Sequence, residues 1–201
     1  MRVVVDNGLG PTRRATAPRR LKSATPAVTL RTAVAADAPA LHALVASHLE
    51  EGHLLPRALG ELTAHAQRFV VAVQASPGAD RIVGCAELAP LSSTVAEVRS
   101  LVVGRESRKL GLGQRMVDEL GRRARREGFE RLCAFAHDPA FFVKFGFSIV
   151  PHTWVPEKIA HDCVSCPLFR NCGQYAIALD LHPMFASAGS PVGTAMLHPY
   201  G

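Results

Sequence analysis

The sequence predicts one α/β domain with a single mixed β-sheet flanked by helices. Three observations lead to this fold class. Seven short segments between residues 28 and 181 have the alternating or β-branched composition of strands. Stretches with apolar residues at helical spacing lie between several of them. The chain has 201 residues, 48% of them hydrophobic, which suits one domain with a sizeable core. Strands interspersed with helices are typical of one sheet covered by helices.

The expected strands are short and bounded by turn residues. The sequence SPGAD, at residues 76–80, joins the second and third strands as a hairpin turn. The predicted strands are residues 28–31, 69–74, 81–91, 95–103, 131–136, 148–151 and 175–181.

Four helices are expected, at residues 38–49, 59–67, 112–127 and 139–145. The third is strongly amphipathic, and Gly128 is placed to end it as a left-handed residue. We expect its apolar face to carry Met116, Val117, Leu120 and Ala124. We expect its solvent face to carry Arg122, Arg123, Arg125 and Arg126.

Charge is distributed unevenly along the chain. Of the net charge of +6, residues 1–27 carry +5 and the remainder carries +1. We interpret residues 1–27 as a disordered basic tail, residues 28–182 as the folded domain and residues 183–201 as a flexible tail. Since the folded part is almost neutral, we expect no nucleic-acid partner.

Apolar runs along the chain are short. None reaches the roughly 18 residues that a bilayer-spanning helix needs. The first residues lack the apolar core of a secretory signal. We therefore expect a cytoplasmic protein with no membrane partner.

A glycine-containing basic loop precedes the third predicted helix. It reads Arg108-Lys109-Leu110-Gly111-Leu112-Gly113 and follows the strand that ends at Val103. A pyrophosphate binds well where backbone N–H groups and a helix N-terminus point inward, and glycines allow the backbone to approach. The alternative is an ordinary strand-to-helix turn, because neither the P-loop nor the Rossmann pattern is complete.

Two motifs in this region resemble those of the GNAT acetyltransferases. The first is R-x-x-G-x-G after the strand E-V-R-S-L-V-V, and the second is the run FFVKFGF at residues 141–147. The resemblance implies the GNAT acyl-CoA N-acyltransferase fold and acetyl-CoA as co-substrate. It implies that the strand from Val98 to Val103 splays from its neighbour, so that backbone groups of Leu101 and Val103 pair with the pantetheine. The implied cofactor-binding residues are Leu101, Val102, Val103, Arg108, Lys109, Leu110, Gly111, Leu112, Gly113, Gln114, Phe142 and Phe145.

Four further segments are similar to the short, single-domain N-acetylglutamate synthases, at residues 51–57, 96–101, 156–159 and 161–172. This resemblance implies transfer of acetyl to the α-amine of L-glutamate by direct attack in a ternary complex, the first step of arginine biosynthesis. Glutamate brings two carboxylates, so its site needs fixed cations. Arg57, Arg99 and Lys158 are the candidates for binding them.

The reaction also needs groups that move protons. Glu97 is the candidate general base, acting through a water. Many GNAT enzymes protonate the thiolate with a Tyr at the position that Phe142 occupies here. Ser100 or His137 could replace that Tyr, or the thiolate could leave unassisted because its pKa is about 8.5.

The cysteines leave a further question open. His161, Cys163, Cys166 and Cys172 could together bind zinc. A single C-x-x-C with one more cysteine lacks the usual paired spacing, so small buried thiols are the interpretation that we favour. A homodimer is compatible with the sequence. Two alternative functions stay open: acetylation of another amine, such as another amino acid or a peptide, and a CoA-binding module without turnover.

Overall fold

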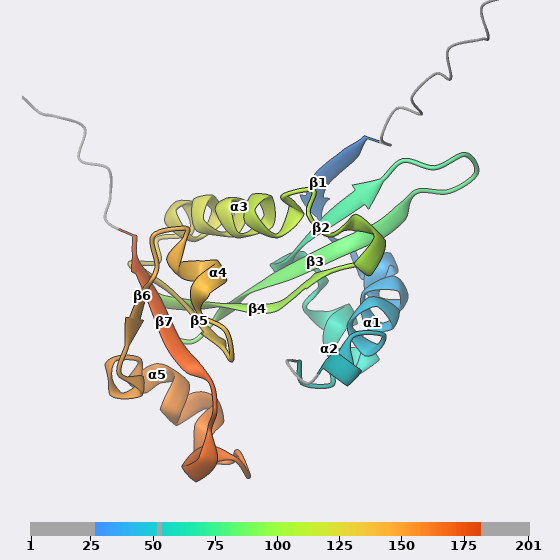
Figure 1. Ribbon diagram of the computed structural model, residues 1–201. Coiled ribbons are helices and arrows are strands. Elements are labelled where there is room, and N and C mark those ends of the chain that lie inside the picture. The colour runs from blue at the N-terminus through green and yellow to red at the C-terminus, as the bar shows by residue number, and fades with distance from the viewer. Residues whose placement is uncertain (1–26, 52–53, 182–201) are drawn as a thin grey trace, which may run out of the picture.

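The computed structural model describes residues 27–51 and 54–181. The predicted tails lie outside these residues, apart from residue 27. The described chain forms one seven-stranded sheet with the order β1-β2-β3-β4-β5-β7-β6 (Figure 1). The strands are β1 (Val28–Thr32), β2 (Phe69–Gln74), β3 (Arg81–Pro90), β4 (Val95–Val103), β5 (Arg131–Ala136), β6 (Ser148–Val150) and β7 (Tyr175–Asp180).

The sheet is mixed, as the sequence predicts. Strands β1 to β4 are successively antiparallel, and β7 pairs antiparallel with β5 on one side and with β6 on the other. The single parallel ladder among the described strands joins β4 to β5. Each predicted strand is confirmed to within two residues, because alternation and β-branched runs are local signals.

Helices cover both faces of the sheet (Figure 1). Helix α3 (Leu112–Arg126) and the short helix α4 (Ala140–Val143) pack on one face in the main hydrophobic core. Helices α1 (Ala38–Ala46) and α2 (Leu59–Ala64) cover the β2–β3 half of the opposite face. Val155, next to helix α5 (Pro156–Lys158), packs on the β4–β5 part of that same face.

Three helices are shorter than predicted: α1 ends at Ala46, α2 ends at Ala64, and α4 covers only Ala140–Val143. At the end of α1, the Ser47 hydroxyl and His48 Nδ1 lie 2.9 and 2.8 Å from the backbone carbonyl of Leu44. Side chains that bond to backbone carbonyls in this way compete with continued helix formation. The sequence also assigned no element to the segment between β6 and β7, where the chain forms α5 and a π-helical turn, Ile159–Cys163.

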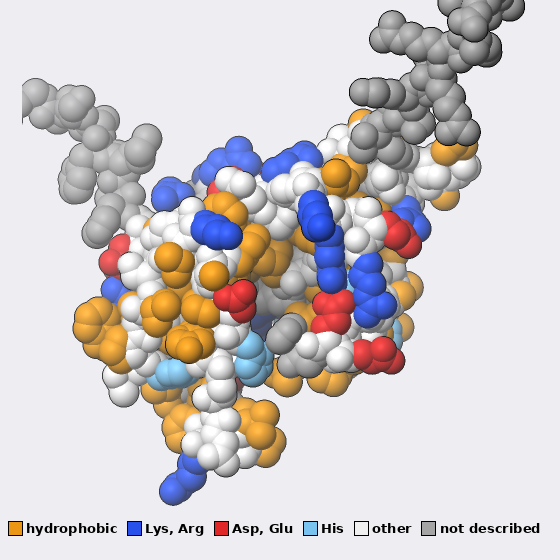
Figure 2. Space-filling view, viewed as in Figure 1, with side chains coloured by type: hydrophobic (Ala, Val, Ile, Leu, Met, Phe, Trp, Pro, Cys, Tyr) orange, Lys and Arg blue, Asp and Glu red, His pale blue; other side chains and the backbone are white. Residues whose placement is uncertain are grey.

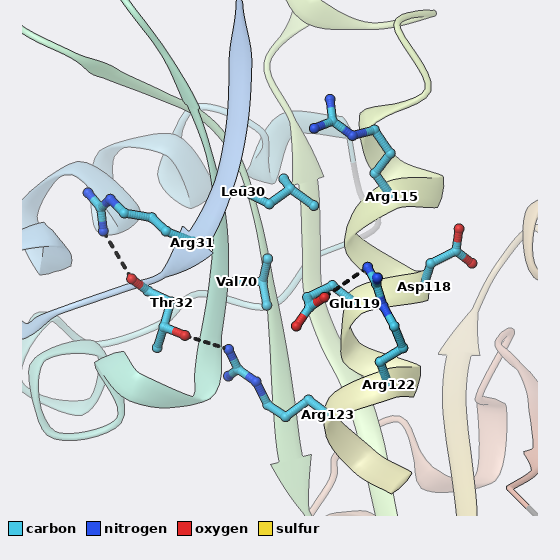
Figure 3. A pocket seen from close by; sticks show the side chains of 9 residues that line it. All are labelled: Leu30, Arg31, Thr32, Val70, Arg115, Asp118, Glu119, Arg122 and Arg123. Atoms are coloured by element: carbon cyan, nitrogen blue, oxygen red, sulfur yellow. Dashed lines mark hydrogen bonds and ion pairs between the residues drawn. The ribbon is translucent and has the colours of Figure 1, made fainter. Parts of the chain in front are cut away.

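The end of α3 confirms its predicted glycine stop. Gly128 has φ +86°, and the N–H of Phe129 donates to the carbonyl of Ala124 in the bond that defines a Schellman motif. Placing Arg123 on the solvent face of α3 was wrong. Its guanidinium is buried and donates to the carbonyl of Gln67 and to the hydroxyl of Thr32, whereas Arg122 turns outward toward Glu119 (Figure 3). A long side chain can reach two acceptors over the sheet edge, which periodicity does not detect.

Candidate active site

Strands β4 and β5 diverge after a short parallel ladder. Their pairing covers Val95, Ala96 and Glu97 of β4, and ends there although β4 continues to Val103. Beyond Glu97, the edge of β4 that faces β5 therefore has backbone groups without a ladder partner. Such groups need hydrogen-bond partners. The splay expected from the resemblance is thus present at the predicted residues.

A β-bulge lies in β4 where the splay opens. Glu87 of β3 pairs with Arg99, whereas Cys85 pairs with Val102, so β4 holds one extra residue between them. Ser100 occupies the bulge with φ +48°, a left-handed conformation that non-glycine residues rarely adopt. The bulge reverses the side-chain alternation. As a result, Leu101 packs toward α3 and Val102 packs toward α1.

The start of α3 presents backbone donors to the region beside the splay. Gly111 precedes the helix with φ +71°. Within the described residues, the backbone N–H groups of residues 111–114 donate no hydrogen bond to the protein. Free N–H groups at the positive end of a 15-residue helix form a good site for a phosphate. This arrangement is the geometry predicted for the pyrophosphate loop.

The aromatic run forms a wall against this loop. A Cβ at Gly113 would lie 3.2 Å from the ring of Phe141, so a larger residue would push this ring away from α3. Phe142 is 7% exposed and packs edge-on against Phe141 and Phe147. The ring of Phe142 is buried in the core, as are the side chains of Val102 and Leu112. These three predicted cofactor-binding residues can therefore contact a ligand mainly through their backbone atoms.

The loop before α3 carries two arginines that share one carboxylate. Arg108 donates to both oxygens of Glu51 at 2.8 Å, and Arg105 donates to one of them at 3.1 Å. Hydrogen bonds from Arg108 and then Arg105 lower the pKa of Glu51. Figure 2 shows a hollow near the centre of this face, with hydrophobic side chains on the α4 side and charged side chains opposite.

Arg57 lies on the face of the sheet that α1 and α2 cover, in a buried cluster of charges. Its Nη1 donates to Glu87 Oε2 at 2.8 Å and to the Ser100 hydroxyl at 2.9 Å. Its Nε and Nη2 donate to both oxygens of Glu61 at 3.1 and 2.7 Å. The side chains of Arg57 and Glu87 are 10% and 2% exposed. Arg57 is therefore fixed in place by its partners on α2, β3 and β4.

The other predicted site residues form a second cluster, which adjoins the first where Arg99 lies opposite Glu87 in the β3–β4 ladder. Lys158 Nζ donates to both oxygens of Glu97, at 2.8 and 2.9 Å, and Arg99 Nε donates to Oε2 of the same carboxylate at 2.5 Å. Asp162 Oδ2 accepts from Lys158 at 2.8 Å and also from Arg99. Burial would raise the pKa of Asp162, but hydrogen bonds with Lys158 and His161 outweigh burial and lower it. Residues predicted separately thus converge on one site.

Three acidic residues of this site were missed by the sequence analysis: Glu61, Glu87 and Asp162. Together with Glu97 they place four carboxylates against the three predicted cations. The three cations therefore already pair with carboxylates of the chain itself, so their presence alone does not indicate an anionic acceptor. The (i, i+4) spacing of Arg57 with Glu61 and of Lys158 with Asp162 was a local signal for two of these pairs.

The arrangement can move protons at two points. Glu97 Oε1 accepts one hydrogen bond from the described residues, from Lys158, so it can accept another from a water or an amine. The Ser100 hydroxyl accepts from Arg57 and keeps its own proton to donate. His137 lies at the end of β5 against Gly173, whose added Cβ would be 3.5 Å from its Nδ1. Ser100 belongs to the Arg57 cluster, and Glu97 belongs to the cluster formed with Lys158 and Arg99.

The cysteines divide by burial. Cys85 and Cys133 are buried in the sheet, and burial raises the pKa of both thiols, that of Cys85 to about 12. The residues proposed as zinc ligands, His161, Cys163, Cys166 and Cys172, lie on the segment between α5 and β7. Within residues 27–51 and 54–181, no three His, Cys, Asp or Glu side chains are arranged to hold a metal ion.

With this geometry established, comparison with known proteins assigns the family. Residues 38–147, more than half of the chain, match the model of the acetyltransferase (GNAT) family. The chain belongs to this family, and acetyl-CoA is its co-substrate. A curated relative, an uncharacterized N-acetyltransferase of Chlorobaculum tepidum, is 28% identical over 152 residues, which are 76% of this chain and 96% of the relative.

Two solved structures are similar in fold. The N-acetylglutamate synthase from Neisseria gonorrhoeae, complexed with coenzyme A and N-acetyl-glutamate, matches with a TM-score of 0.67 and 25% identity. The match covers 80% of this chain but only 36% of that protein. Rv2747 from Mycobacterium tuberculosis, in complex with CoA, matches with a TM-score of 0.64 and 25% identity over 76% of this chain and 98% of that one. No helix of the described residues is long and apolar enough to cross a membrane.

Proposed function

We propose that this acetyltransferase transfers acetyl from acetyl-CoA to the α-amine of L-glutamate, giving N-acetylglutamate for arginine biosynthesis in the cytoplasm. The observation that carries the proposal is the convergence of Arg57, Arg99 and Lys158 with Glu97 beside the β4–β5 splay. The similarity to the synthase from Neisseria gonorrhoeae supports the choice of acceptor.

In the proposed reaction, the free N–H groups of residues 111–114 bind the pyrophosphate of acetyl-CoA. The open edge of β4 beyond Glu97 pairs with the pantetheine. Together they direct the thioester toward the face that carries Glu97 and Ser100. Basic side chains near the loop, with Arg108 held by Glu51, add attraction for the phosphates.

The acceptor binds on the cation cluster, in a ternary complex. Arg57, Arg99 and Lys158 are the groups with which its carboxylates pair. Glu97 accepts the amine proton through a water at Oε1, and the deprotonated nitrogen attacks the acetyl carbonyl directly. Ser100 then donates a hydrogen bond to the departing CoA thiolate. Fixed ion pairs position these groups before the reactants meet.

One feature favours a second candidate, an acceptor other than glutamate. The four carboxylates around three cations would suit an amino acid or peptide that brings less negative charge. A homodimer is compatible with either candidate.

The test is steady-state turnover of purified protein with acetyl-CoA and a panel of amines. Loss of the thioester is the measured signal, and the amines are L-glutamate, L-glutamine, L-aspartate, spermidine and a peptide N-terminus. We expect the highest kcat/KM with L-glutamate. A higher value for another amine would replace glutamate and retain the family activity. Binding of acetyl-CoA without turnover of any amine would indicate a non-catalytic module.

The role of Arg57 needs a variant that does not leave Glu87 buried without a partner. We therefore choose the double variant Arg57→Gln with Glu87→Gln, which replaces the ion pair by neutral amides of similar size. The KM for glutamate should rise at least tenfold while the KM for acetyl-CoA stays unchanged. The matched control is Arg131→Gln with Asp180→Asn, an exposed pair outside the site, which should alter neither KM.

A further inference from the structure

Asp162 pairs with two of the three cations that the proposed function assigns to the acceptor, Arg99 and Lys158. Its Oδ2 accepts hydrogen bonds from both Lys158 and Arg99, so one oxygen of the chain's own carboxylate bridges the pair. A substrate carboxylate that bound the same two cations would need this position. Asp162 and the acceptor therefore compete for the same donors.

Exposure indicates which member of the cluster can be displaced. The Asp162 side chain is 32% exposed, compared with 21% for Arg99, 15% for Lys158 and 5% for Glu97. Asp162 is thus the outermost of the four groups, and Glu97 is the innermost. A ligand that arrives from solvent would meet Asp162 first, and rotation of this one half-buried side chain would free both cations while Glu97 keeps them in place.

The local backbone also indicates that Asp162 is the displaceable member of the cluster. Asp162 lies in the π-helical turn Ile159–Cys163, which is closed by a bond from the Val164 N–H to the Ile159 carbonyl. Single π turns are frequent at functional sites. The other oxygen of Asp162 lies 2.7 Å from Nδ1 of His161, an exposed side chain that can hold the carboxylate outside the cluster.

We propose that Asp162 is a competing carboxylate that sets acceptor affinity: it holds Arg99 and Lys158 in position, and one carboxylate of the acceptor replaces it on binding. This inference rests on the proposed use of these two cations for the acceptor. Asp162 is a positioning residue in this scheme, because it keeps the cations paired and oriented and leaves when the acceptor enters.

The opposing explanation is a structural one, in which Asp162 anchors the segment after α5 to β4 permanently. The two explanations predict opposite changes. Removal of a competitor lowers the KM for the acceptor, whereas removal of an anchor raises it, lowers kcat and destabilises the fold.

The experiment measures kcat and KM of the full chain and of Asp162→Asn at saturating acetyl-CoA. The acceptors are L-glutamate and its two monoamides, L-glutamine and L-isoglutamine, each of which lacks one carboxylate. We expect Asp162→Asn to lower the KM for glutamate about tenfold, the scale of one charge-assisted hydrogen bond. The decrease in KM should persist with one monoamide and vanish with the other. The carboxylate that is missing from the second monoamide is then the one that competes with Asp162. Asp180→Asn, which removes a paired acid outside the site, is the matched control and should leave KM unchanged.

An unchanged or higher KM for glutamate in Asp162→Asn would overturn the proposal, as would an equal decrease with both amides. Asp162→Ala and unfolding curves for each variant separate a loss of fold from a loss of binding. If another amino acid proves to be the acceptor, the glutamate assignment fails, and the same comparison is made with that acceptor and its amide. If no amine turns over, the affinity for glutamate is measured by calorimetric titration in the presence of CoA. The proposal predicts tighter binding to Asp162→Asn than to the unaltered protein, and equal or weaker binding contradicts it.

Discussion

Truncation of Glu87 is the perturbation that most directly tests the buried charge cluster. The Glu87 side chain is 2% exposed and its oxygen lies 2.8 Å from Arg57 Nη1. Removing one partner of a buried ion pair leaves the other charge uncompensated, which costs about 3–5 kcal/mol. Glu61 still compensates part of the Arg57 charge, so we expect Glu87→Ala to lie near the lower end of that range. The isosteric Glu87→Gln keeps a neutral hydrogen-bond acceptor and should cost roughly 1–2 kcal/mol.

Urea unfolding of the three proteins measures these differences by linear extrapolation. For a domain of this size, a loss of about 3 kcal/mol corresponds to a decrease in Tm of roughly 6–12 °C. The matched control is Glu61→Ala, which removes the half-buried partner of the same arginine and should cost less than about 1 kcal/mol. A loss below about 1 kcal/mol in Glu87→Ala, or an equal loss in Glu61→Ala, would refute the assignment of Glu87 as the principal anchor of Arg57.

Three further predictions concern the phosphate loop, the buried thiols and the cysteine segment. Gly111→Ala forces a side chain into a φ of +71°, so it should cost about 1–2 kcal/mol and raise the KM for acetyl-CoA. Gly60→Ala, in α2 with open space around the added Cβ, is its control and should leave that KM unchanged. The folded-state pKa of Cys85 is raised to about 12, so its stabilising effect is present below the unfolded pKa of about 8.5 and is lost above it. Between pH 9 and 12 the free energy of unfolding should therefore fall by about 1.4 kcal/mol per pH unit on account of this thiol, and urea unfolding of Cys85→Ala should lack that contribution. EDTA should leave the Tm unchanged, because no metal-binding group is formed within the described residues; a chelator-induced decrease that Cys163→Ser abolishes would contradict this.

The site could be predicted in part because its separate pieces have local signals. The residues that end β4 and begin α3 carry the glycines and basic groups of a phosphate loop within one short stretch. Arg57, Arg99, Lys158 and Glu97 were named from motifs, and the structure brings them together. The pairing of these residues across the fold had no comparable signal, because Arg57 and Glu87 are 30 positions apart and Arg99 and Asp162 are 63 apart.

The sequence by itself determined the positions of the strands along the chain, the glycine-containing loop before α3 and the glycine that ends α3, since periodicity and backbone preference act over a few neighbouring residues. Only the tertiary structure decided that Arg123 is buried and that Ser100 forms a bulge which reverses the alternation of β4. It also decided that one oxygen of Asp162 bridges Arg99 and Lys158. The physical reason is that burial and ion pairing depend on which distant segments meet on the sheet, and this depends on the packing of the whole domain.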